Sequence, residues 1–178
     1  MPTSLPYLFV FLTCFLLAAC SSTLRLEDVA GEQAAIGCSG VSRFADDKSR
    51  ASPEQLKLLS EGKAHYRDGD YALAEKSFRK ATEASSFGKS GKSRVANLEA
   101  WFGLAASYDQ LKRFDLADQI YEHIRTDYGP SVTYHNNYGY SLELRGEDKL
   151  AQSQYRMAMD LAPDCQISRN NLAASTAN

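Results

Sequence analysis

Apolar residues recur along the chain at helical spacing, and the blocks that they form repeat one another. From 98 to 128, large and small apolar side chains alternate three or four positions apart, which predicts two amphipathic helices joined by a short turn. The same alternation recurs from 132 to 165, and a third copy lies upstream at 58–84. The aligned positions are Leu58, Gly62, Ala74, Phe78 and Ala81, then Trp101, Ala105, Ala117, Tyr121 and Ile124, then His135, Gly139, Ala151, Tyr155 and Ala158.

The spacing of these copies predicts the fold. Ala117 and Ala151 lie 34 residues apart, which is the period of a tetratricopeptide repeat. Each such repeat is a helical hairpin, in which small residues allow close approach of the two helices and aromatic residues fill the space between neighbouring hairpins. We therefore expect an all-α fold, a solenoid of three tetratricopeptide hairpins with a C-terminal capping helix, preceded by a flexible leader.

Capping and turn signals set the expected boundaries. Ser52 and Pro53 suit the start of a helix, and Pro163 suits the end of the third hairpin. A lone helix at 166–175 would cover the apolar end of the stack, as solenoids require. The repeat domain is thus expected over 54–176. Its hairpin helices are expected at about 53–67, 71–85, 95–111, 114–128, 132–144 and 149–161.

An insertion separates the first two copies, which are offset by 43 residues instead of 34. The inserted segment contains two Gly-Lys-Ser steps, but the phosphate-binding pattern needs a glycine five positions earlier, where Glu83 and Ser86 stand. We interpret the segment as a solvated basic loop. The alternative is a contact point for an acidic partner, through Lys89, Lys92 and Arg94.

The amino terminus carries an apolar run that ends in Leu17-Ala18-Ala19-Cys20. The run is shorter than the roughly 20 residues of a membrane span and suits a signal peptide over residues 1–19. Its end resembles a bacterial lipoprotein signal, which implies lipidation of Cys20, although no Lys or Arg precedes the run. An ordinary signal peptide is the alternative. Ser21 is similar to the sorting residue of Gram-negative outer-membrane lipoproteins, which implies a lipid-anchored, periplasm-facing protein. Residues 20–53 then form a spacer, rich in Ser, Gly and charged residues.

Two cysteines remain outside these segments, because Cys14 lies within the signal and Cys20 is assigned to the lipid. Cys38 lies in the leader and Cys165 follows the third hairpin. The 16 residues from Cys38 to Glu54 span about 50 Å when extended, which is enough to reach the far end of the stack. The two cysteines either form a disulfide or remain two separate thiols.

Catalytic chemistry has little support in the sequence. His65, His123 and His135 fall in three different repeats and none has the spacing of a metal ligand. No nucleophile motif is present, so we expect a protein that is not an enzyme and that uses no metal or cofactor. The net charge of −2 argues against nucleic acid as a partner.

Protein binding has more support, because the first helix of each repeat faces the concave side of such a stack. The expected groove offers aromatic anchors, amides and few charges, a mixture that suits an extended peptide. A clamp for chaperone carboxylate tails would need Lys and Asn one turn apart, where this chain has Leu59 and Lys63. The expected groove residues are Leu59, Lys63, Tyr66, Arg67, Phe102, Ala106, Asp109, Gln110, Asn136, Tyr140, Glu143 and Asn170.

Three phrases resemble a particular family. Gly103–Asp118, Asn136–Gly146 and Arg169–Leu172 are similar to the repeat lipoprotein of tight-adherence (Tad, Flp-type) pilus assembly systems. The resemblance spans about Trp101 to Ala173. It implies an assembly factor, or pilotin, for the outer-membrane secretin through which the pilus passes, with the secretin or another pilus or secretion component as partner. The alternative is a general periplasmic adaptor that docks peptidases or cell-wall enzymes.

Overall fold

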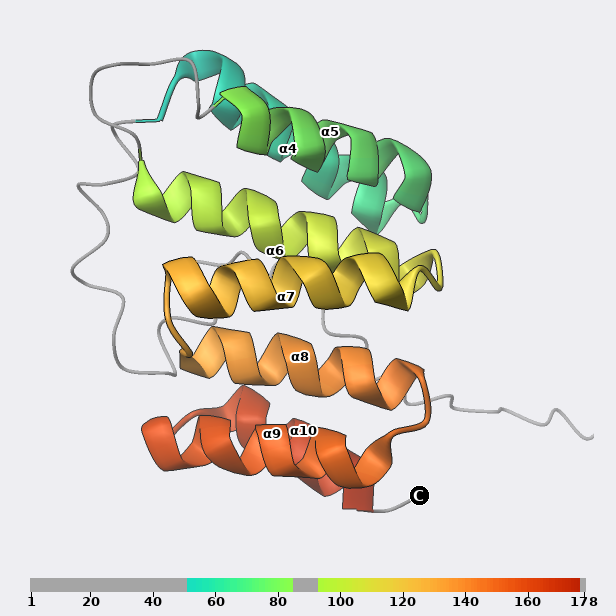
Figure 1. The fold of residues 1–178 in the computed structure, drawn as a ribbon, viewed down its shortest axis with the longest axis vertical. Helices are drawn as coiled ribbons and strands as arrows, with labels where there is room; N and C mark the ends of the chain where they lie inside the picture. Colours follow the sequence, from blue (N-terminus) through green and yellow to red (C-terminus); the bar gives the residue numbers. More distant parts are fainter. Residues whose placement is uncertain (1–50, 85–92, 177–178) are drawn as a thin grey trace, which may run out of the picture.

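The computed structural model describes residues 51–84 and 93–176, which form seven α-helices (Figure 1). Each helix boundary lies within one residue of the position predicted from capping and periodicity. The predicted signal peptide, Cys20, the spacer with Cys38 and most of the inserted loop lie outside the described residues. The helices are α4 (Pro53–Arg67), α5 (Tyr71–Ala84), α6 (Arg94–Gln110), α7 (Phe114–Asp127), α8 (Val132–Leu144), α9 (Asp148–Leu161) and α10 (Gln166–Thr176).

Serine caps begin the first helix of every hairpin. The hydroxyls of Ser52, Ser93 and Ser131 each accept a backbone N–H three residues on, at 3.0, 3.0 and 3.1 Å. These bonds satisfy amides that have no partner within the helix, which stabilises each start by about 1 kcal/mol.

The turn inside each hairpin has the same geometry in all three repeats. The residue at its centre has positive φ: Gly69 at 82°, Lys112 at 59° and Gly146 at 76°. In each turn the next amide reaches back to a carbonyl five residues earlier, as for Glu147 N to Leu142 O at 2.9 Å. Glycine adopts this conformation freely, whereas Lys112 holds it at a cost in backbone strain.

The helices pair into the hairpins α4–α5, α6–α7 and α8–α9, which stack in chain order from one end of the molecule to the other (Figure 1). The first helices also touch their counterparts, α4 with α6, α6 with α8, and α8 with α10. They therefore form the inner layer, and α5, α7 and α9 form the outer layer. Helix α10 packs on α8 and α9 and covers the end of the core, as predicted for a cap.

Aromatic rings wedge between the helices at the positions where the repeat pattern places them. Phe78 is fully buried between two glycines, Gly62 of α4 and Gly103 of α6, where any added Cβ would lie less than 3 Å from its ring. Tyr155 occupies the equivalent space against Gly139. Ala117 and Ala151 are also fully buried. Small residues are thus needed where the rings press against a neighbouring backbone.

Within the described residues, no helix has both the length and the hydropathy to cross a membrane.

Candidate protein-binding surface

The predicted groove residues all lie on the inner helices α4, α6, α8 and α10, and most of them reach the surface. Arg67 and Asn170 are exposed. The residues that are partly exposed are Lys63, Tyr66, Ala106, Gln110, Tyr140 and Glu143.

Four of the predicted groove residues are buried, and this part of the prediction is wrong. Leu59, Phe102, Asp109 and Asn136 expose between 1% and 5% of their surface. Neighbouring inner helices touch, so these side chains fill the seam between repeats instead of facing a partner. Asn136, for example, donates from Nδ2 to Ser168 Oγ of the capping helix at 3.0 Å.

A row of polar and aromatic side chains crosses the inner layer, with one member from each repeat. Gln110 of α6 lies close enough to the hydroxyls of Tyr66 on α4 and Tyr140 on α8 to influence the pKa of both phenols. Burial raises the pKa of both phenols, and the nearby Gln110 amide opposes that rise. Tyr66 also packs edge-on against Tyr71, with ring centroids 5.1 Å apart. The row Tyr66–Gln110–Tyr140 thus presents one amide and two phenol hydroxyls, all partly exposed, on three neighbouring inner helices.

The charges beside this row are paired within the fold. Lys63 forms an ion pair with the buried carboxylate of Glu99. Glu143 Oε2 accepts a hydrogen bond from the Tyr155 hydroxyl at 2.8 Å. Burial raises the pKa of Tyr155, and its bond to Glu143 raises it further. A partner would meet few unpaired charges in this part of the inner face.

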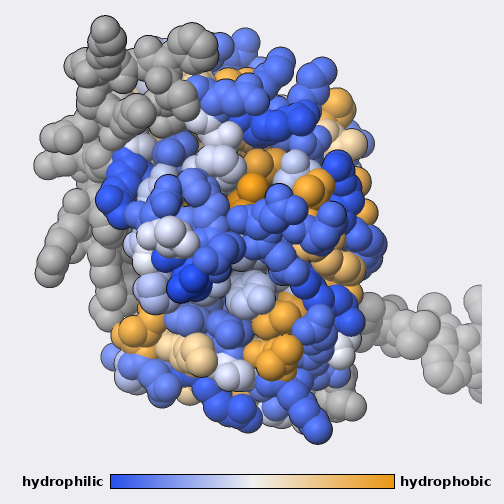
Figure 2. Space-filling view, viewed as in Figure 1, coloured by the Kyte–Doolittle hydropathy of each residue, from blue (hydrophilic) through white to orange (hydrophobic). Residues whose placement is uncertain are grey.

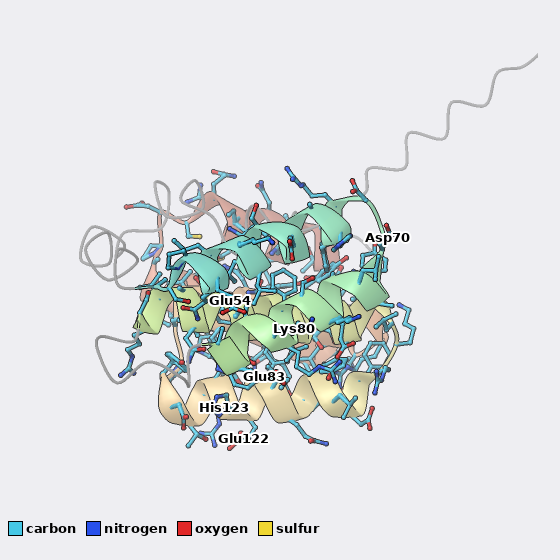
Figure 3. All side chains as sticks on the ribbon, turned by 90° about the horizontal axis from the view of Figure 1, so that it is seen from above. Glu54, Asp70, Lys80, Glu83, Glu122 and His123 are labelled. Carbon is cyan, nitrogen blue, oxygen red and sulfur yellow. The ribbon has the colours of Figure 1, made fainter. Side chains whose placement is uncertain are left out.

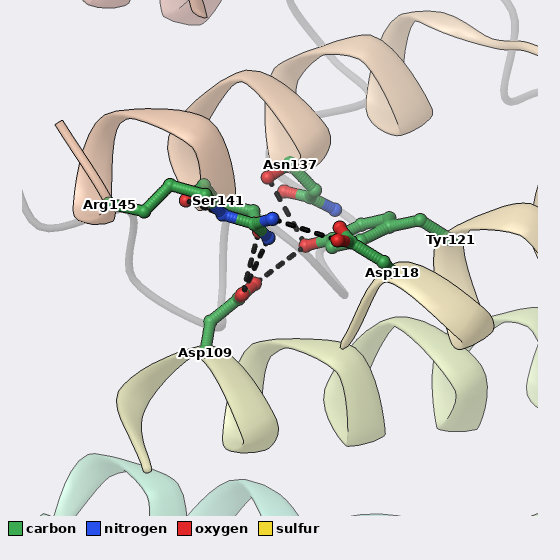
Figure 4. A network of polar contacts seen from close by, with 6 residues as sticks. All are labelled: Asp109, Asp118, Tyr121, Asn137, Ser141 and Arg145. Atoms are coloured by element: carbon green, nitrogen blue, oxygen red, sulfur yellow. Dashed lines mark hydrogen bonds and ion pairs between the residues drawn. The ribbon is translucent and has the colours of Figure 1, made fainter. Parts of the chain in front are cut away.

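A buried polar network lies beneath the inner face and joins the second and third repeats (Figure 4). Asp109 of α6 accepts from Ser141 Oγ at 2.6 Å, and its Oδ2 lies 3.1 Å from the Tyr121 hydroxyl. Arg145, which directly follows α8, donates to Ser141 Oγ at 2.6 Å and to Asp118 Oδ2 at 2.9 Å. Three helices, α6, α7 and α8, thus meet at one carboxyl group.

The protonation of Asp109 decides how that network is bonded. Burial raises the pKa of Asp109 to about 6, against the opposing effects of the Ser141 and Tyr121 hydrogen bonds and of Arg145. The Tyr121 hydroxyl has one hydrogen but lies 3.1 Å from two acceptors, Asp109 Oδ2 and the Asn137 carbonyl. When Asp109 is protonated it can donate to Tyr121, which frees the hydroxyl to donate to Asn137. When Asp109 is ionised, the two acceptors compete.

Sequence reasoning placed Asp109 in the groove and gave Ser141 and Arg145 no role. The available signal was their spacing: Ser141 lies four residues before Arg145 at the C-terminal end of α8, so the two side chains lie on the same side. Nothing in the sequence indicated that this face meets Asp109.

The histidines take part in packing. His123 lies against Trp101 with ring centroids 4.4 Å apart, and His135 Nδ1 is 2.8 Å from Gln154 Oε1. The described residues contain no group of three or more His, Cys, Asp or Glu side chains that would hold a metal ion. On the outer layer, Lys80 and Glu122 are exposed, and Glu122 lies at the outer edge of the molecule (Figure 3).

Two segments, residues 58–86 and 98–124, match the tetratricopeptide repeat model, and they correspond to the first two hairpins. The third hairpin, α8–α9, repeats their geometry outside the matched segments. The chain therefore contains tetratricopeptide repeats, which typically form non-catalytic scaffolds for binding other proteins. Neither the curated proteins nor the solved structures include a match to the chain.

Proposed function

We propose that this protein is an outer-membrane lipoprotein whose inner face binds the secretin of a Tad-type pilus and assists its assembly. Three features support the proposal: the repeat scaffold, the lipoprotein-like Leu17–Cys20 sequence, and the resemblance of three phrases to the Tad repeat lipoprotein. The observation that carries the binding step is the Tyr66–Gln110–Tyr140 row.

The row suits an extended segment of a protein partner. Its amide and hydroxyl groups can pair with peptide backbone, and its rings supply apolar contact. Because its members come from three consecutive repeats, the partner segment would cross the helices and contact each repeat in turn. Leu59, Phe102 and Asn136 are buried, so the proposed contacts are assigned to the partly exposed members of the inner helices.

The proposed lipid on Cys20 would locate the interaction at the outer membrane. A secretin subunit in the periplasm must reach the outer membrane before it assembles, and a partner already anchored there makes the encounter local. Effective concentrations in the millimolar range are typical of short tethers. More than one acyl chain on Cys20 would hold the complex stably at the membrane.

The first test concerns the anchor. Cys20→Ser should release the protein from the membrane fraction and abolish acylation measured by mass spectrometry. Retention of the Cys20→Ser protein as firmly as wild type would contradict lipidation at this residue.

The second test concerns the row. Protein purified with its lipid is used to pull secretin from detergent-solubilised envelope, comparing wild type with Gln110→Ala plus Tyr140→Ala. Each truncated anchor should weaken binding by about 1 kcal/mol or more. Leu73→Ala, at an exposed apolar residue of the outer helix α5, is the matched control and should bind as wild type does. Equal recovery with all three proteins would remove the row as the binding site.

A deletion strain separates the pilotin role from the alternative. Secretin that fails to assemble in the outer membrane without this protein supports the proposal. Normal secretin assembly would leave the general periplasmic adaptor as the better explanation.

A further inference from the structure

Cys165 lies in the turn between α9 and α10, fully buried, and it is disulfide-bonded. The other cysteines of the chain are Cys14, Cys20 and Cys38, all outside the described residues. The bond therefore ties the last repeat to the segment that precedes the repeat domain. Cys38 is the nearest of the three to the domain in sequence. Cys14 lies in the predicted signal peptide and Cys20 is the predicted lipidation site, so Cys38 is the remaining candidate.

An apolar stripe on the outer face of α9 leads up to this turn. Leu150, Met157 and Leu161 expose 55%, 43% and 56% of their surface. Their spacing of seven and four residues places them on one side of the helix. Figure 2 shows apolar side chains gathered over the lower part of the molecule, where α9 lies. The residues that α9 buries, such as Ala151 and Tyr155, lie on a different side.

The stripe ends four residues before Cys165, so whatever is bonded to Cys165 is held beside it. The leader carries apolar residues over the stretch that precedes Cys38, at Leu24, Leu26, Val29 and Ile36.

We propose that Cys38 pairs with Cys165 and that residues 24–36 dock along the Leu150–Met157–Leu161 stripe. The lengths match: the stripe spans about 17 Å of helix, and residues 24–36 cover about 18 Å as a helix and more when extended. The segment carries three acidic residues and one basic residue, so its carboxylates can approach the exposed Lys149 and Arg156, which lie beside the exposed Asp148 and Asp160 of the same helix.

The covalent bond makes weak docking sufficient. A segment attached this close to its site has an effective concentration in the millimolar range, so modest apolar contact keeps it bound. In forming the bond, the two thiols lose two protons and two electrons to the disulfide of a thiol–disulfide exchange partner, which is reduced to a dithiol. The leader then joins the domain at the last repeat, and the inner face stays open. This inference does not depend on the proposed partner.

The test uses the full mature chain, purified oxidised, and follows hydrogen exchange of residues 24–36 together with peroxide oxidation of Met157. Peptide mapping should recover Cys38 linked to Cys165. With a docking constant near 0.1 mM, the tether should slow Met157 oxidation about tenfold relative to the Cys38→Ser protein. Cys38→Ser is preferred to Cys165→Ser because it removes the same disulfide bond without a substitution at the fully buried Cys165. Met159, partly buried on the same helix, is the internal control.

Substitutions in the stripe distinguish its contribution to docking from that of the disulfide bond. Leu150→Ser plus Leu161→Ser should keep the disulfide but lose protection of residues 24–36, whereas Leu73→Ser, at the exposed Leu of α5, should change neither. Unprotected residues 24–36 in the oxidised wild type would overturn the proposal. A bond from Cys165 to Cys20 would also overturn it. So would protection of Met157 that persists in Cys38→Ser and increases with protein concentration, because that result would mean that a second copy of the chain covers the stripe.

Discussion

Gly103 is the position where the repeat packing can be tested most directly. An added Cβ there would lie 2.5 Å from Cε1 of Phe78, against the 3.4–4 Å of ordinary contact. The ring cannot retreat, because Gly62 presses on it from the other inner helix, where a Cβ would come within 2.8 Å. Gly103→Ala should therefore force the two hairpins apart by several tenths of an ångström or more.

Two effects of opposite sign set the magnitude. Overpacking a close-packed core costs about 1–3 kcal/mol. Replacing glycine with alanine inside a helix gains about 1 kcal/mol. The net expectation for Gly103→Ala is a loss of up to about 2 kcal/mol, and Gly62→Ala should lose less because its overlap with the ring is smaller.

The assay is urea unfolding followed by circular dichroism, in the wild-type and Phe78→Leu backgrounds. Without the ring, the clash is gone and the helix preference remains, so Gly103→Ala should be neutral or stabilising by up to about 1 kcal/mol. The sign of the effect thus reverses between backgrounds. An equal loss in both backgrounds, or a gain in the wild type, would refute the packing argument.

Three further predictions concern other parts of the stack. Ala151→Leu should cost about 1–3 kcal/mol in thermal unfolding, because Ala151 is fully buried where α9 meets α8; no loss would mean that the assigned repeat register is shifted. Asp109 has a folded-state pKa of about 6 against 3.8, so its stabilising contribution is complete below about pH 4 and is lost as the pH rises to 6. Relative to Asp109→Asn, wild type should lose about 2–3 kcal/mol over that window in urea unfolding, and a pH-independent difference would count against the assignment. Lys112→Gly should stabilise by about 0.5–1 kcal/mol by relieving its positive φ, whereas Gly146→Ala in the equivalent turn should destabilise; a loss from Lys112→Gly would contradict the strain.

The sequence alone determined the helices, their pairing and the order of the stack. Ser52, Ser93 and Ser131 cap their helices through residues only three positions away, so a short window contains the whole interaction. The 34-residue spacing of Ala117 and Ala151 then implies the same hairpin in each repeat. Such signals are local or periodic, so both can be recognised without knowing which distant segments of the chain come into contact.

The tertiary structure decided which polar residues of the inner helices face a partner. Asp109 and Gln110 are adjacent in sequence, yet Asp109 is buried against Ser141 and Tyr121 while Gln110 reaches the surface between two tyrosines. The position of a residue within the repeat predicts which side of its helix the side chain lies on. Whether that side chain reaches solvent depends on how closely the next inner helix approaches, and the rings and glycines between repeats set that approach.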